Sequence, residues 1–310
     1  MNQLVRASCI LSLGILSLLS CTKDDFKENE VPVADAGPSK AVTSPASSET
    51  LSGTGTDNDG DVVAYLWSQV SGPGASLIVN PGSAITLIED LVEGTYVFQL
   101  MVTDDKGATG VDTTSITVSP APIQTLTLQP SNNPLEYVLE SKNGQAGTGS
   151  MDIPVAQWTI SSIPITLREI LKFDLSSIPS NATIISANLY LYSYPTPTLN
   201  GNFVDANYGA NNTLLVQQVT ANWSPSTLTW ANQPASATTN QVIAASTTQS
   251  QLDLNLDVKN IVASMVSGNA NYGFMLKLQN EVIYTSRLFV SSYNTTHATK
   301  HPKLVVVYEL

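Results

Sequence analysis

The chain has 310 residues, is 42% hydrophobic and only 12% charged, and contains 17 prolines and 18 glycines. Together with its abundance of Ser, Thr, Asn and Val, this composition predicts an extracellular all-β protein with many turns. The net charge of −12 excludes nucleic acid and anionic membrane surfaces as general partners, because like charges repel.

Residues 1–20 predict a cleaved lipoprotein signal peptide. A single positive charge at Arg6 precedes an apolar stretch that is too short to span a bilayer. The string LLSC at 18–21 resembles a bacterial lipobox, and this resemblance implies a diacylglyceryl thioether on Cys21. The charged segment 21–30 is predicted to be an acidic tether and resembles the surface-export signal of some Gram-negative lipoproteins. We therefore expect an outer-membrane protein that is held by lipid at Cys21 and faces the cell exterior; an ordinary secretory signal with an incidental Cys21 is the alternative.

The predicted cleavage leaves no thiol for structural use. Cys9 leaves with the signal and Cys21 is acylated, so neither a disulfide nor a cysteine-based metal site is expected. Stability must then come from hydrophobic cores, and the length of the chain predicts two domains.

Residues 31–119 show short strands separated by turns. One strand buries alternate side chains at Tyr96, Phe98, Leu100 and Val102, and an earlier strand carries Trp67. The strings PVADAG (32–37), DNDGDVVAYLWSQVSGP (57–73) and GTYVFQLMVTDDKGAT (94–109) resemble a PKD domain. This resemblance implies a small immunoglobulin-like β-sandwich that acts as a spacer or an interaction module in surface proteins.

Three acidic residues in this segment raise the question of calcium. Asp57, Asp59 and Asp61 alternate as in a calcium-binding loop, but such a loop needs Gly at Val62 and a bidentate Glu at Ser68. We therefore expect a tight turn and predict no cofactor and no metal, with structural calcium as the weaker alternative.

Residues 120–124 are rich in proline and predict a stiff hinge, after which 125–310 form a second strand-rich domain. One strand is predicted to direct inward the side chains of Ile185, Ala187, Leu189 and Leu191. A helix is predicted from Asp257, which can cap it, to Gly268, with an apolar stripe at Val258, Ile261, Val262 and Met265. These elements predict a larger, jelly-roll-like β-sandwich with one short helix.

Five ordered strings carry a second resemblance. They are REILKFDLSSIPSNATIISANLYLY (168–192), WSPSTLTWANQP (223–234), LDVKNIVASMVSG (256–268), YGFMLK (272–277) and HPKLVVVY (301–308). Together they resemble the DNRLRE domain, also grouped as carbohydrate-binding module family 96, over about 125–310. The resemblance implies polysaccharide binding and is compatible with alginate. The segment between Glu140 and Thr166 departs from the usual first hairpin of the family, so no ligand contacts are transferred there.

Two groups of residues are candidates for the binding site. Tyr190, Tyr192 and Tyr194 share the face opposite the aliphatic stripe and would form a flat platform for sugar rings, unless another layer covers that face. Arg168, Lys172, Lys277 and Arg287 lie on three strands and would form a basic groove for a uronate-bearing glycan if the fold brings them together. The alternative is four solvated charges at strand edges.

The remaining conspicuous residues predict structural roles. Trp223 and Trp230 are expected in the core, and Asp174 is expected to fix a turn. The two histidines, His297 and His301, have no evident carboxylate partner, and no serine lies in a glycine-rich nucleophile turn. Catalysis is therefore not expected.

The sequence thus predicts a non-catalytic, lipid-anchored surface protein that binds polysaccharide through its C-terminal domain, with a uronate-containing, alginate-like glycan as the candidate ligand. The PKD-like domain would act as a spacer, and neighbouring polysaccharide-degrading or import proteins would use the captured glycan. An adhesin or structural surface protein that binds another protein is the alternative.

Overall fold

The computed structural model describes residues 27–310, apart from 132, 134, 142, 143, 148, 198–203 and 269. The predicted signal peptide, Cys21 and the tether up to Phe26 lie outside the described residues. The chain divides into two compact units, Met1–Ser119 and Pro120–Leu310. In the part of the chain that is described, no helix is both long and apolar enough to cross a membrane.

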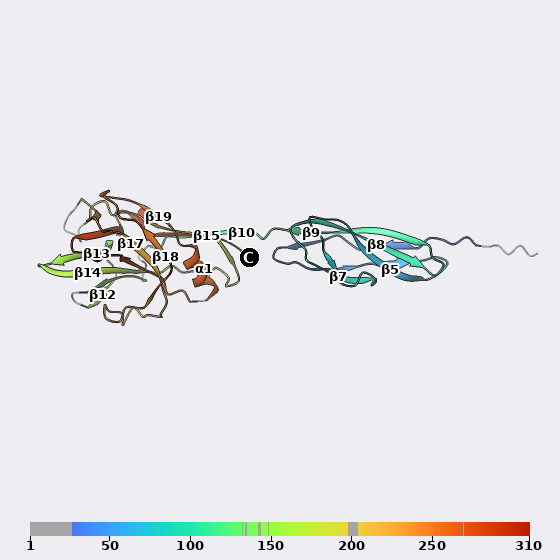
Figure 1. The fold of residues 1–310 in the computed structure, drawn as a ribbon, viewed down its shortest axis with the longest axis horizontal. Coiled ribbons are helices and arrows are strands. Elements are labelled where there is room, and N and C mark those ends of the chain that lie inside the picture. The colour runs from blue at the N-terminus through green and yellow to red at the C-terminus, as the bar shows by residue number, and fades with distance from the viewer. Residues whose placement is uncertain are drawn as a thin grey trace, which may run out of the picture. The chain divides into compact units, whose positions relative to one another are not determined.

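The first unit is a β-sandwich (Figure 1). Its strands are β1 (Val33–Asp35), β2 (Lys40–Thr43), β3 (Glu49–Ser52), β4 (Thr54–Thr56), β5 (Val62–Ser71), β6 (Leu77–Ile78), β7 (Ile85–Glu89), β8 (Gly94–Asp104) and β9 (Thr109–Ser119). One sheet runs in the order β2-β9-β8-β5, a second in the order β3-β7-β6, and β1 pairs with β4.

The core of this unit follows from the alternation seen in the sequence. Every second side chain of β8 is buried, from Tyr96 to Val102, as predicted. Trp67 packs in the same core, and its indole N–H donates a hydrogen bond to the carbonyl of Ser83 at 3.0 Å. Ile88 of the second sheet closes the core, which confirms the predicted small sandwich.

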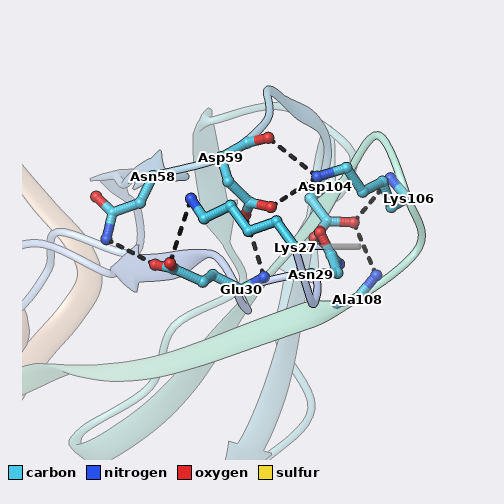
Figure 2. A network of polar contacts seen from close by, with 8 residues as sticks. All are labelled: Lys27, Asn29, Glu30, Asn58, Asp59, Asp104, Lys106 and Ala108. Atoms are coloured by element: carbon cyan, nitrogen blue, oxygen red, sulfur yellow. Dashed lines mark hydrogen bonds and ion pairs between the residues drawn. The ribbon is translucent and has the colours of Figure 1, made fainter. Parts of the chain in front are cut away.

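The last residues of the predicted tether are bound to loops of this unit, as Figure 2 shows. The Glu30 N–H donates to Asp59 Oδ1 at 3.1 Å, and Asn29 Nδ2 donates to Asp104 Oδ2 at 2.8 Å. The Lys106 ammonium lies 2.8 Å from Asp59 Oδ2. Among the described residues, no group of three or more His, Cys, Asp or Glu could hold a metal ion.

The second unit is a larger β-sandwich (Figure 1). Its strands are β10 (Ile123–Leu128), β11 (Glu136–Glu140), β12 (Gln145–Gly147), β13 (Asp152–Ile160), β14 (Ile163–Leu171), β15 (Thr183–Leu191), β16 (Asn207–Tyr208), β17 (Leu214–Val219), β18 (Ser236–Ala244), β19 (Leu254–Asp257), β20 (Phe274–Leu278), β21 (Thr285–Val290) and β22 (Lys303–Glu309). One sheet has the order β10-β22-β15-β19 and the other β16-β21-β13-β14-β20-β17-β18, with β11 joining β14 to β12.

The long sheet divides at β14. The first half of β14 pairs with β13, through Ile163 to Leu167, while its last residues, Glu169 to Leu171, pair with β20. The main core contains Val155 of β13, Leu276 of β20 and Leu189 of β15. The curled sandwich with a single described α-helix confirms the predicted fold class.

Two local predictions can be compared directly with the structure. The helix α1 (Lys259–Ser267) begins two residues later than expected, but the Asp257 carboxylate still accepts a hydrogen bond from the Lys259 N–H at 2.9 Å. Ile261, Val262 and Met265 are buried, as predicted. The predicted inward position of Ile185 is wrong, because a register shift against β22 lies between Ile184 and Ser186 and leaves Ile185 exposed.

Candidate functional site

One face of the long sheet brings together two of the four predicted cations. Residues paired directly across antiparallel strands share a face, and the pairs are Ile170 with Met275 and Leu215 with Lys277. Arg168 lies two residues before Ile170 on β14 and therefore projects from the same face. We call this surface, around Arg168 and Lys277, the cationic face.

Arg168 is held by three groups. Its Nε and Nη2 atoms donate to the two carboxylate oxygens of Glu281 at 2.8 and 3.0 Å, and its Nη1 donates to Gln233 Oε1 at 2.8 Å. Its guanidinium carbon lies 4.8 Å from the ring centroid of Trp230, a cation–π contact. The fork of Arg168 is thus fixed in a geometry that accepts a carboxylate.

Lys277 adds a second positive charge beside Arg168. Burial lowers the pKa of Lys277, and the positive charge of Arg168 lowers it further, whereas the Glu281 carboxylate opposes this. The two cations therefore share one carboxylate, so the cationic face keeps an excess of positive charge on an acidic chain.

A small apolar cluster lies next to Arg168 and Lys277 on the same face of the sheet. It contains Ile170, Met275 and Val219, with Trp223 and Trp230 packed against it. The Trp223 indole N–H donates to the carbonyl of Tyr272 at 2.8 Å, which agrees with its predicted structural role. Trp230 also packs on the cluster, and in addition it supports Arg168, a role that the sequence did not indicate.

The other two predicted cations lie elsewhere. Arg287 is fully buried and donates to the backbone carbonyls of Asn212 and Ala245, so its predicted place in a surface groove is wrong. Burial lowers its pKa to about 10. Lys172 follows the end of β14, about 13 Å along the strand from Arg168, and lines a separate pocket with Asp174.

The three tyrosines do not form one flat platform. The ammonium of Lys303 covers the Tyr190 ring at 4.4 Å from its centroid. The chain leaves β15 after Leu191, and Ser193 pairs with β21 of the other sheet, which breaks the alternation. Tyr194 is consequently buried, with its ring 5.8 Å from that of His297, while Tyr192 is half-buried.

The fold defines the class of protein: two β-sandwich units in sequence, each with its own core. Family models specify them further. Residues 36–118 match the model described as K319L-like, PKD domain, and residues 158–308 match carbohydrate-binding module family 96, in the predicted order. Both are domains of non-catalytic kinds.

Similar proteins were found for both parts of the chain. The Mus musculus dyslexia-associated protein KIAA0319-like protein is 42% identical over 80 residues, which are 26% of this chain and 8% of that protein. This chain therefore spans less than a tenth of the length of that relative. The solution structure of the PKD domain from KIAA 1837 protein is 32% identical, over 30% of this chain and 92% of that one, with a TM-score of 0.27. A structure described as a carbohydrate-binding module from the beta-sandwich super family is 13% identical, over 91% and 98% of the two chains, with a TM-score of 0.24.

Proposed function

We propose that this chain is a non-catalytic, lipid-anchored surface protein that binds uronate-containing polysaccharide through its C-terminal domain. The match of residues 158–308 to carbohydrate-binding module family 96 supports polysaccharide binding. The fork of Arg168, fixed on Trp230 beside Lys277, is the observation that carries the preference for uronate.

The chemistry of this face suits a sugar carboxylate. Glu281 already presents a carboxylate to Arg168 in a bidentate arrangement, so the uronate groups of an alginate-like chain match the same donors. Lys277 supplies a second cation within electrostatic range, and it favours a polymer with repeated negative charges. The side chains of Arg168 and Glu281 are 23% and 28% exposed, so a polymer can reach this pair from solvent.

In this proposal, the other parts of the chain hold the binding site at the cell surface. Lipid on Cys21 would anchor the chain in the outer membrane facing outward, and the PKD domain would act as a spacer. A protein that only binds works by concentrating its ligand, so neighbouring degrading or import proteins would use the captured glycan.

Native gels that contain alginate, polygalacturonate or neutral glycans test the proposal. We expect both acidic polymers to retard the purified full-length chain, and Arg168→Ala or Lys277→Ala to weaken this binding about tenfold. Lys172→Ala serves as the matched control, because it removes the same charge outside the cationic face. Absence of retardation by every acidic and neutral glycan would overturn polysaccharide binding and favour an adhesin that binds protein.

A further inference from the structure

A second group of aromatic residues lies on the face of the long sheet opposite the cationic face. The Trp158 ring contacts that of Tyr208, with centroids 5.5 Å apart, and that of Tyr284, with centroids 5.2 Å apart. Tyr208 and Tyr284 are 42% and 53% exposed, respectively. We call these three residues the aromatic corner, because the two tyrosine rings stand at 74° and 81° to the tryptophan ring.

The pairing of the strands places the aromatic corner. One cross-strand row runs through Glu140, Leu167, Ala156, Ser286 and Tyr208. The next row contains Ile165 and Trp158, with Tyr284 immediately before the first pair of β21. Since Leu167 and Arg168 are neighbours on a strand, the aromatic corner and the cationic face project from opposite sides of β14.

A pocket of about 350 Å³ adjoins the aromatic corner. Ile165 and Leu167 line this pocket, and Trp158 packs against the apolar cluster that contains both residues, so the pocket and the corner are neighbours. Glu140 is the one charged residue among the described residues that line the pocket. Ser150 adds a hydroxyl group, and two glycines add backbone groups. The lining thus combines apolar walls with a few polar groups, as in sites for small polar ligands.

The backbone conformation of Tyr284 is energetically unfavourable. Its φ angle is +64°, a left-handed conformation that is unfavourable for a bulky side chain. The residue remains more than half exposed, so burial in a core does not compensate this free-energy cost. Such conformations are concentrated at functional sites, where they orient a side chain toward a ligand.

We propose that the aromatic corner and its pocket form a second carbohydrate site, which takes a neutral sugar ring. This inference rests on the proposed function. Aromatic rings pack against the C–H faces of a pyranose, and the rings at near right angles enclose one sugar better than they support a long flat chain. The Glu140 carboxylate repels a uronate and accepts hydrogen bonds from sugar hydroxyls.

The two sites differ in charge, so they select different sugars. The cationic face carries Arg168 and Lys277, whereas the charged group at the pocket is the acidic Glu140. The loop between β20 and β21 contributes to both, because Glu281 binds Arg168 and Tyr284 packs on Trp158. A polysaccharide with both uronate and neutral units would bind to both sites of one domain.

The test measures retardation of the full-length chain in native gels that contain hydroxyethylcellulose, galactomannan or xylan, with alginate alongside. We expect at least one neutral glycan to retard the protein, and Trp158→Ala and Tyr284→Ala to weaken that binding about tenfold. Binding to alginate should be unchanged in both variants. Tyr190→Ala is the matched control, since this half-buried tyrosine lies on β15, outside the aromatic corner.

Several outcomes separate the two proposals. The second site is overturned if the variants bind neutral glycans like the unmodified chain, or if alginate alone is bound. It is also overturned if sedimentation shows a dimer that Trp158→Ala dissociates, because the aromatic corner would then be a contact between copies. If no glycan is bound at all, the proposed function itself fails. Should Trp158→Ala not fold, the exposed Tyr208→Ala and Tyr284→Ala variants carry the test.

Discussion

Glu281 holds Arg168 through both carboxylate oxygens, at 2.8 and 3.0 Å, although the two residues are 113 positions apart in the chain. Glu281 belongs to the exposed loop between β20 and β21 and is itself partly open to solvent. The group that keeps Arg168 in place is thus also a carboxylate that a bound uronate would have to displace or share.

We therefore expect Glu281→Gln to bind alginate about three to ten times more tightly, because an internal competitor for Arg168 is removed. Partly exposed ion pairs contribute little, so the free energy of unfolding should fall by less than about 1 kcal/mol. Titration calorimetry at two salt concentrations measures the affinity. Glu93→Gln, which changes the same charge at an exposed site in the first unit, is the control. Weaker binding would show instead that Glu281 itself bonds the glycan.

Arg287 should affect stability and not binding. Its guanidinium is fully buried and donates to the carbonyls of Asn212 and Ala245, which Arg287→Met would leave without a partner. We expect a loss of about 3 kcal/mol in the free energy of unfolding, measured with urea. Arg168→Met removes the same charge from the cationic face and should instead weaken binding of alginate with little change in stability. Equal stability of the two variants would contradict this assignment.

The contrast between these two arginines shows what the sequence could predict. Alternation correctly predicts the buried positions of Leu189 and Leu191, because strand period depends on neighbours in the chain. The burial of Arg287 cannot be predicted in this way, since its carbonyl partners come from loops 75 and 42 residues away in the chain. An isolated Arg is usually a surface residue, so the prediction followed the more common case.

The aromatic residues illustrate the same limit. Tyr190 and Tyr192 follow a visible alternation, but the covering Lys303 comes from β22, which pairs with β15 only in the folded chain. Trp158 lies in the segment that departs from the family pattern, and its partners Tyr208 and Tyr284 lie far along the chain. No local pattern joins these three residues, so only the sheet order brings them together.

Glu169 should make the second unit less stable as the pH rises. Neither of its carboxylate oxygens has a hydrogen bond of good geometry. Burial raises its pKa well above 4.5, the nearby Glu136 and Asp152 raise it further, and the amide of Tyr137 compensates only in part. The folded chain therefore retains a proton that the unfolded chain releases above pH 4.5. The contribution of Glu169 to stability is fully present below this pH and is lost as the pH rises toward the raised pKa.

Glu169→Gln should remove this dependence, because the amide stays neutral at every pH. Urea unfolding between pH 5 and pH 8, followed by a signal from the second unit, compares the variant with the unmodified chain. We expect the variant to be at least as stable at pH 8 and to show a flatter pH profile. Glu93→Gln should keep the original profile. A variant with the same slope as the unmodified chain would mean that Glu169 is ionised in the folded state.

Lys106 should control how firmly the end of the tether is held. Its ammonium binds both the carboxylate and the carbonyl of Asp59, and the same carboxylate accepts the Glu30 N–H (Figure 2). The pairing with Lys106 lowers the pKa of Asp59, so the carboxylate remains charged and able to accept this bond. We expect Lys106→Met to speed hydrogen exchange at the Glu30 amide, while Lys40→Met, which breaks a comparable pair with Glu49, leaves that amide unchanged. If the Glu30 amide exchanges equally fast in both variants and in the unmodified chain, Lys106 does not hold the tether. Where it does, the ordered part of the first unit includes Asn29 and Glu30, which bond to Asp104 and Asp59.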